Sequence, residues 1–246
     1  MKKVVGMVFF GLLDLMIAML VFIPMRLIKL VSRRPLDELI YGYKKFSENA
    51  IVLIHGSGVN EAQFMPARKI IDDLKIDAEV YSCDLNSGGT YSSDKYDSIE
   101  LYAARAHRYM QNNVSGKNIT LIGHSMGGLV AAYLAENYDD IKVDKVITIA
   151  TPWQGAYMLK YLYGMLSFNT ERHKQMVPGS EFLNELKTKA IHNGKEYITV
   201  GCSYDFQVLE GCAHIYGGDE TRISIASGHI AVIVMPGLWK KLLCKN

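Results

Sequence analysis

The sequence has few cysteines and no spacing of them that would hold a metal ion. The 246 residues include four cysteines, at positions 83, 202, 212 and 244, without Cys-x-x-Cys or zinc-ligand spacing. Four cysteines are too few to form the framework of a chain this long, which excludes a disulfide scaffold. A single Cys202–Cys212 bridge stays open at this point.

Net charge and nucleotide-binding motifs are also scarce. There are 27 Lys and Arg residues against 25 Asp and Glu residues, a formal net charge of +2, so nothing indicates a nucleic-acid partner. The chain has no H-E-x-x-H, no G-x-x-x-x-G-K-[ST] and no strand-linked G-x-G-x-x-G. Metalloprotease, P-loop and dinucleotide-binding functions therefore lack support, and we expect neither a metal nor an organic cofactor.

One long apolar run lies near the N-terminus. Residues 4–25 hold 18 apolar residues, two glycines, Asp14 and Pro24. As a helix they would rise about 33 Å, enough to cross a hydrocarbon core of about 30 Å. Asp14 would cost roughly 2.5–3.5 kcal/mol on insertion, while the Val, Leu, Ile and Phe residues would return about 4–8 kcal/mol. The run thus predicts a single transmembrane anchor within residues 1–32.

Two other interpretations of this run remain open. It could be a signal peptide, cleaved to give a secreted protein, although no A-x-A-like site follows it. It could also be a helix of a soluble domain or an amphipathic surface segment. The positive charges on its two sides favour a cytoplasmic domain only slightly, so the membrane face stays undecided: Lys2 and Lys3 precede the run, and Arg26, Lys29, Arg33 and Arg34 follow it.

Residues 36–246 alternate short β-rich runs with helical patterns. Continuous apolar runs of this length suit strands that are covered on both faces, as in a parallel sheet. Strands that alternate with helices predict a doubly wound α/β domain. The expected strands are 50–56, 78–84, 118–124, 144–150, 196–202 and 221–226, and the clearest helices are 65–75, 96–112 and 126–137.

One interval interrupts this alternation. Residues 152–195 contain no clear strand but two helix-like stretches, 157–168 and 181–191, separated by Pro178-Gly179. Such an insert could form a cap or lid over a site at the strand ends, or its helices could be ordinary packing helices.

A serine lies in a turn between an expected strand and an expected helix. Gly123-His124-Ser125-Met126-Gly127 directly follows strand 118–122 and opens helix 126–137. A turn this tight needs small residues at 123 and 127, and it exposes the Ser125 hydroxyl at the sheet edge. The helix N-terminus there directs free N–H groups toward the place where an oxyanion would form. This context makes Ser125 a candidate nucleophile.

These residues resemble the α/β-hydrolase superfamily, specifically its lipase and esterase branch. The Gly-His-Ser-Met-Gly-Gly elbow is the form met in bacterial triacylglycerol lipases. His55-Gly56-Ser57-Gly58 is similar to their oxyanion loop, and Thr151-Pro152-Trp153-Gln154-Gly155 is similar to the T-P-x-x-G segment after their next strand. The resemblance covers about residues 50–235. It implies an oxyanion hole made by the backbone amides of Ser57 and Met126, within a loop that contains His55 and Gly56.

The same resemblance implies a Ser–acid–His order for the remaining catalytic residues. A neutral serine hydroxyl needs a base near pH 7. His229, in Ser227-Gly228-His229-Ile230 after the last strand, occupies the expected place for it. Asp205 follows strand 196–202 as the family's aspartate does. Asp219 is the fallback, although it precedes the last strand and should lie at the opposite end of it.

We therefore expect an α/β-hydrolase fold with a mostly parallel central sheet, helices on both faces and a helical cap insert, preceded by one hydrophobic helix. The expected function is a serine hydrolase acting on lipid-type acyl esters. A small-ester carboxylesterase, an acyltransferase or a thioesterase could use the same triad. A non-catalytic, membrane-anchored module that binds a lipid or a partner is the alternative of another class. The sequence does not predict an oligomeric state.

Overall fold

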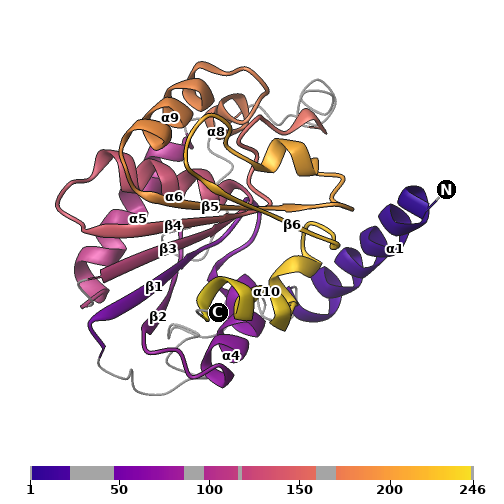
Figure 1. The fold of residues 1–246 in the computed structure, drawn as a ribbon, viewed down its shortest axis with the longest axis horizontal. Coiled ribbons are helices and arrows are strands. Elements are labelled where there is room, and N and C mark those ends of the chain that lie inside the picture. Colours follow the sequence, from indigo (N-terminus) through magenta and orange to yellow (C-terminus); the bar gives the residue numbers. More distant parts are fainter. Residues whose placement is uncertain (1, 23–46, 86–96, 116–117, 159–169, 245–246) are drawn as a thin grey trace.

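Six parallel strands form one sheet at the centre of the domain (Figure 1). The computed structural model describes residues 2–22, 47–85, 97–115, 118–158 and 170–244. The strand order is β2-β1-β3-β4-β5-β6, which confirms the predicted doubly wound α/β class. The strands are β1 (Asn49–Ile54), β2 (Glu79–Cys83), β3 (Asn118–His124), β4 (Val143–Ile149), β5 (Glu196–Cys202) and β6 (Thr221–Ile225).

Helices cover both faces of this sheet (Figure 1). One face packs against α5 (Ile99–Asn113), α6 (Met126–Asn137) and α9 (Glu181–His192), and the other against α4 (Met65–Asp73) and α10 (Pro236–Leu243). Because a parallel strand needs a crossover connection, the strands from β1 to β5 are joined through these helical layers, whereas β5 and β6 are joined by a loop that contains only the 3₁₀ turn η3. The shorter elements are α8 (Glu171–Gln175) and the 3₁₀ turns η2 (Glu61–Phe64), η3 (Glu210–Ala213) and η4 (Ala231–Val234).

The strand β1 illustrates why the sequence runs were continuously apolar. Val52 and Ile54 belong to the hydrophobic cluster under α5 and α6, whereas Ile51 and Leu53 belong to the cluster under α4 and α10. Alternate side chains of a strand point to opposite faces, and here both faces are buried. Each of the six expected runs forms a strand within two residues of its predicted ends.

Helix α6 approaches the sheet closely through its first turn. A Cβ atom on Gly127 would overlap the backbone carbonyls of Ile54 and His55, and one on Gly128 would overlap the Thr151 side chain. Glycine is needed at both positions because the helix touches backbone at one and a packed side chain at the other. This contact sets the position of the turn that precedes α6.

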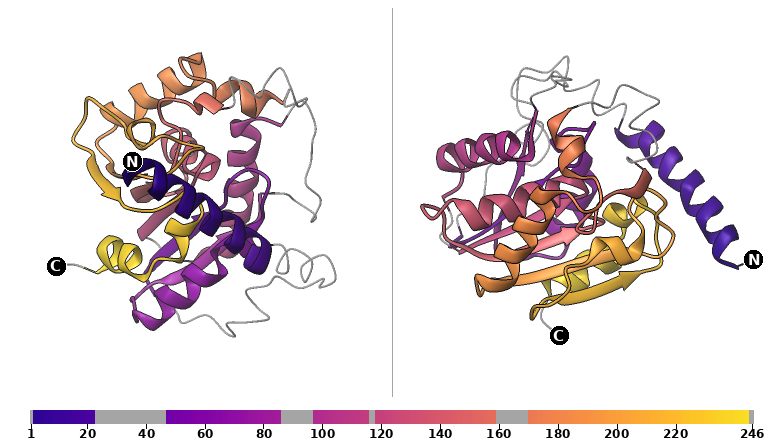
Figure 2. Two further views of the ribbon diagram at one scale, coloured as in Figure 1. Left: turned by 90° about the vertical axis from the view of Figure 1, so that its right-hand side faces the viewer. Right: turned by 90° about the horizontal axis from the view of Figure 1, so that it is seen from above.

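The N-terminal helix lies outside the two layers, beside the edge of the sheet at which the strands end (Figure 2). It comprises α1 (Lys2–Ile17) and the π-helical turn η1 (Ala18–Phe22). The stretch Lys3–Leu20 is long and apolar enough to cross a membrane, and only 6% of it is buried against the rest of the protein. It could serve as a membrane anchor or a signal sequence. The remainder of the predicted segment, 23–32, lies outside the described residues.

All four cysteines are free thiols, so the Cys202–Cys212 bridge left open above is not formed. Cys202 is buried at the end of β5, and this burial raises the pKa of its thiol. A buried, protonated thiol is a poor nucleophile and a poor metal ligand.

The close approach of α6 makes a testable prediction about Gly127. We expect Gly127→Ala to lower the free energy of unfolding by about 2–3 kcal/mol or more, because backbone carbonyls cannot move aside for the new methyl group. Gly237→Ala is the matched control: no atom lies within 4 Å of a Cβ there. In helix α10 this change should be neutral or stabilising by up to about 1 kcal/mol. Urea unfolding in a fixed detergent measures both, and equal stabilities of the two variants would contradict the packing argument.

Candidate active site

Ser125 sits in a strained turn between β3 and α6. Its backbone angles are φ 55° and ψ −127°, in a region that non-glycine residues rarely adopt. The Ser125 N–H donates a hydrogen bond of 2.8 Å to the Ile149 carbonyl, which holds the turn at the carboxyl edge of the sheet. Strain of this kind costs about 1–3 kcal/mol and persists only where the surrounding packing enforces it. Here it directs Ser125 into a cavity.

His229 and Asp205 form a direct hydrogen bond beside that cavity. The His229 Nδ1–H donates to Asp205 Oδ2 over 2.6 Å, and both side chains are buried. The other carboxylate oxygen, Oδ1, accepts from the backbone amides of Gln207 and Val208 at 2.8 and 2.9 Å. Because Nδ1 carries the donated proton, the free lone pair lies on Nε2 of His229. His229 and Ser125 line the same cavity.

The structure places the fallback acid elsewhere. Asp219 is exposed and precedes β6, so it lies at the opposite end of that strand from His229. Parallel strands bring their carboxyl ends to one edge, which is why the residues after β3, β5 and β6 meet there. The structure therefore places Ser125 and His229 on one cavity, with Asp205 bonded to His229, and leaves Asp219 out.

The expected oxyanion loop lies next to Ser125. A Cβ on Gly56 would come within 3.2 Å of the Ser125 Cβ, and both Ser57 and Met126 line the cavity that holds Ser125. His55 does not line this cavity. Its Nε2 accepts a hydrogen bond of 3.0 Å from the Leu85 amide, and its Nδ1 donates one of 2.9 Å to the Gly56 carbonyl. His55 thus holds the loop in place.

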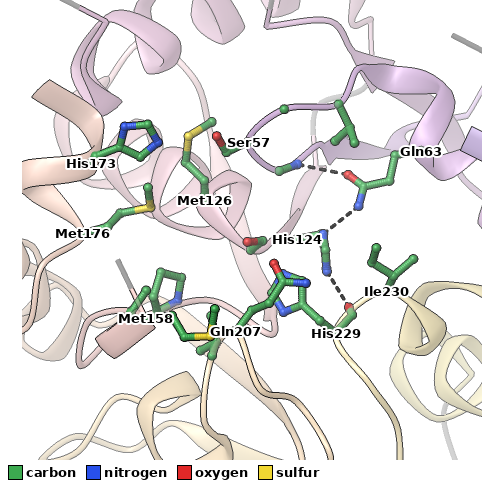
Figure 3. Close-up of a pocket in the computed structure, with 17 residues that line it drawn as sticks. Ser57, Gln63, His124, Met126, Met158, His173, Met176, Gln207, His229 and Ile230 are labelled. Atoms are coloured by element: carbon green, nitrogen blue, oxygen red, sulfur yellow. Dashed lines mark hydrogen bonds between the residues drawn. The ribbon is translucent and has the colours of Figure 1, made fainter. Parts of the chain in front are cut away.

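A hydrogen-bond chain connects this loop to the histidine loop (Figure 3). The Gly56 amide donates to Gln63 Oε1 over 3.0 Å, and Gln63 Nε2 donates to His124 Nδ1 over 2.7 Å. His124 Nε2 then donates to the His229 carbonyl over 2.8 Å. The sequence placed His124 in the elbow but did not indicate Gln63, because no local pattern marks a glutamine that bridges residues 61 positions apart.

This chain requires a neutral His124. The imidazole accepts at Nδ1 and donates at Nε2, which is the arrangement of one neutral tautomer. Burial, helped by the neighbouring His229, holds the pKa of His124 well below its ordinary value. The lowered pKa therefore supports the neutral state that the hydrogen bonds need.

The cavity is small and mostly apolar. It encloses about 350 Å³ among the described residues, at the lower end of the range for ligand sites. Three methionines contribute to its wall, Met126 at the elbow and Met158 and Met176 opposite it (Figure 3). Methionine side chains adapt to irregular apolar shapes, so the wall can fit apolar groups of more than one shape.

The described residues of the interval 152–195 partly pack on the core and partly line the cavity. Leu183 and Leu186 of α9 are buried in the cluster that contains α6, so this helix packs on the core. Met158, His173 and Met176, in contrast, line the cavity above Ser125. The expected helix 157–168 lies almost entirely outside the described residues, and a mobile lid stays a prediction.

In the part of the chain that the structure describes, no group of three or more His, Cys, Asp or Glu residues could hold a metal ion.

Comparisons with known proteins agree with this architecture. The family model described as "alpha/beta hydrolase fold" matches residues 49–191, and the chain belongs to this family. A biotin biosynthesis bifunctional protein, BioHC, from Teredinibacter turnerae is 31% identical over 239 residues, covering 78% of this chain. The chain spans only 40% of the length of that relative.

Solved structures with low sequence identity share the fold. A lipase-esterase related protein from Clostridium acetobutylicum is 17% identical with a TM-score of 0.61, covering 80% of this chain and 93% of its own. A bromoperoxidase from Bacillus anthracis is 12% identical with a TM-score of 0.60, covering 82% and 92%. The phospholipase PlaB from Legionella pneumophila is 15% identical with a TM-score of 0.52, covering 63% and 37%. At these identities the likeness concerns the fold.

The bridging role of Gln63 predicts a large effect of removing its amide. Gln63→Leu should lower the free energy of unfolding by about 2–4 kcal/mol, because the Gly56 amide and His124 Nδ1 lose their buried partner. Gln111→Leu is the control: that exposed amide donates a hydrogen bond to Asp140, and its loss should change stability by less than about 0.5 kcal/mol. Chemical denaturation of both variants measures the difference. Similar losses would show that the hydrogen-bond chain contributes little.

Buried histidines predict a loss of stability in mild acid. Burial and the adjacent Arg172 lower the pKa of His173 from 6.5 to about 4, and burial also lowers the pKa values of His124 and His214. Below about pH 6.5 the unfolded chain binds protons that the folded chain does not, so the free energy of unfolding falls as the pH falls. Each histidine contributes up to about 1.4 kcal/mol per pH unit until its folded pKa is reached.

Urea unfolding at pH 7 and pH 5 tests this. We expect His173→Asn to reduce the difference in stability between the two pH values, and the exposed His192→Asn to leave it unchanged. An equal pH dependence in wild type and His173→Asn would contradict the assignment.

Proposed function

We propose that this protein is a serine hydrolase that cleaves carboxylic esters, with Ser125 as nucleophile, His229 as general base and Asp205 as the residue that orients His229. The observation that carries the proposal is the buried His229–Asp205 hydrogen bond beside the cavity into which the strained Ser125 turn opens. Ser125, Asp205 and His229 follow β3, β5 and β6, which is the serine–acid–histidine order of this family. Membership in the α/β-hydrolase family and a lipase-esterase related structural neighbour support hydrolase chemistry.

In the proposed mechanism, Ser125 Oγ attacks the ester carbonyl while His229 Nε2 takes its proton. The backbone amides of Ser57 and Met126 stabilise the tetrahedral oxyanion, and Asp205 stabilises the imidazolium. His229 then protonates the leaving alcohol, which leaves an acyl group on Ser125. A water molecule, activated by His229, attacks this acyl-enzyme, and the acid is released.

Lipid-type acyl esters are the substrate class that we propose. The cavity wall beside Ser125 is largely apolar, with methionines 126, 158 and 176 around it. An apolar wall stabilises an acyl chain by removing it from water, and it offers little to a polar acyl group. A structural neighbour is named as a phospholipase, which is compatible with this class.

Attachment to a membrane would bring the enzyme to such substrates. We propose that residues 4–25 provide it, as the length and hydropathy of Lys3–Leu20 allow. Many of the large apolar side chains of α1 are exposed, among them Val8, Phe9 and Leu12. An apolar surface of this kind on a soluble protein would favour aggregation, whereas a lipid phase would cover it.

The test is hydrolysis of p-nitrophenyl esters from C2 to C16, together with labelling by a fluorescent fluorophosphonate. Ser125→Ala should abolish labelling and reduce kcat to background, and His229→Asn should reduce kcat at least about 10³-fold. Asp205→Asn should also lower kcat strongly, because the imidazole loses the partner that fixes its tautomer. The matched control is Asp219→Asn, which should retain wild-type kcat.

The chain-length profile decides the substrate class. Activity that rises toward long acyl chains supports a lipid-type substrate, and a maximum at C2–C4 would replace it with a small-ester carboxylesterase. Absence of both labelling and hydrolysis in the wild-type protein would contradict the serine hydrolase and favour a binding role.

A further inference from the structure

The apolar N-terminal run contains a single acidic residue, and that residue is buried. Asp14 is 3% exposed, whereas its neighbours Leu12 and Leu15 are 59% and 51% exposed. The carboxylate therefore faces the catalytic domain, while the apolar side chains around it face away. Burying a carboxylate costs free energy unless it accepts hydrogen bonds. The groups that donate to Asp14 therefore show which part of the domain this face of α1 binds.

Those partners belong to the loop of the candidate catalytic histidine. Asp14 Oδ1 accepts hydrogen bonds from the backbone amides of Ile230 at 3.0 Å and Ala231 at 2.6 Å. On the other side of His229, a Cβ on Gly228 would come within 2.7 Å of Asp14 Oδ2. One carboxylate thus contacts the backbone on both sides of His229. Hydrogen bonds from amides to a charged acceptor are stronger than those between neutral groups.

The same face of α1 contacts the loop of the candidate acid. Phe10 stacks on Tyr204 with ring centroids 5.0 Å apart and planes 9° from parallel. A Cβ on Gly6 would overlap the Tyr204 ring, and one on Gly11 would lie 3.7 Å from Phe206. Tyr204 and Phe206 flank Asp205 in the sequence.

These contacts follow the geometry of a helix. Gly6, Phe10 and Asp14 are spaced four residues apart, so they lie on one face. That face carries a glycine, an aromatic ring and a carboxylate. These residues suit contact with the protein surface formed by the two loops better than contact with lipid.

We propose that Asp14 is a positioning residue of the active site: by binding the Ile230 and Ala231 amides it fixes the loop that carries His229. The inference rests on the proposed function, because it assigns to His229 the role of general base. His229 must present Nε2 to Ser125 while Nδ1 stays bonded to Asp205, and a small displacement of its loop would spoil this alignment. Asp14 acts through that loop and does not touch the reacting atoms.

The contact also constrains how α1 meets a membrane. Asp14 lies near the middle of residues 4–25, so a helix crossing the bilayer would bring the His229 loop to the centre of the hydrocarbon core. Polar loop backbone is not tolerated there. While Asp14 is bound to the loop, α1 therefore lies beside the domain (Figure 2). Many of its large apolar side chains are then exposed.

The experiment compares Asp14→Leu and Asp14→Asn in the full-length, detergent-solubilised protein. Leu removes both hydrogen bonds, while Asn keeps one carbonyl oxygen that can accept them. We expect Asp14→Leu to lower kcat at least about 10-fold with KM changed less than about 2-fold, and Asp14→Asn to recover most of the loss. Asp72→Leu, an equivalent change at an exposed position of α4, is the matched control and should retain wild-type kcat.

Hydrogen–deuterium exchange of peptides covering 226–234 gives a readout that does not depend on activity. The amides of Ile230 and Ala231 should exchange at least about 10-fold faster in Asp14→Leu than in wild type, with slower exchange restored in Asp14→Asn. Unchanged exchange or unchanged kcat in Asp14→Leu would overturn the proposal. Equal losses of kcat and Tm in both variants would also overturn it, since they would assign a general folding role. If wild type neither hydrolyses esters nor reacts with the fluorophosphonate, the proposed function fails. The exchange data still decide whether Asp14 holds the loop of Ile230 and Ala231.

Discussion

The close contact between helix α6 and strand β1 is the constraint on which the site depends. Gly127 lies so near the carbonyls of Ile54 and His55 that no side chain fits between them. The contact brings the start of α6 down onto the sheet and forces the preceding residue, Ser125, into a positive φ. Ser125 and the loop of residues 55–58 are neighbours for the same reason, because β1 ends in that loop. The contact at Gly127 therefore determines both how α6 packs on the sheet and where Ser125 lies.

Around this fixed turn, the remaining groups are carried by longer loops and need additional support. Asp205 is held by two backbone amides, and His229 by Asp205 on its side chain and by His124 on its carbonyl. Gln63 extends this support to the oxyanion loop. Loops are the least rigid parts of an α/β domain, so a connected set of buried hydrogen bonds is needed to hold them at one geometry.

Helix α1, which lies outside the α/β domain, also supports the loops of the candidate site. A segment whose composition is typical of a membrane helix contacts the two loops that bear Asp205 and His229. Its outer side is apolar and exposed, while its inner side holds Asp14. The helix thus combines, on opposite faces, an exposed apolar surface and a surface that fits the loops of the candidate site.

The sequence alone determined the fold class, the strands and the turn at Ser125, because apolar runs covered on both faces and a glycine-flanked serine are local patterns. The candidate residues Asp205 and His229 followed from the family's order along the chain. The chain order could not reveal which distant groups support them. Gln63 lies 61 residues from His124, and Asp14 lies 216 residues from Ile230. Only the tertiary structure decided these contacts, because a buried hydrogen bond depends on where the folded chain brings two groups together.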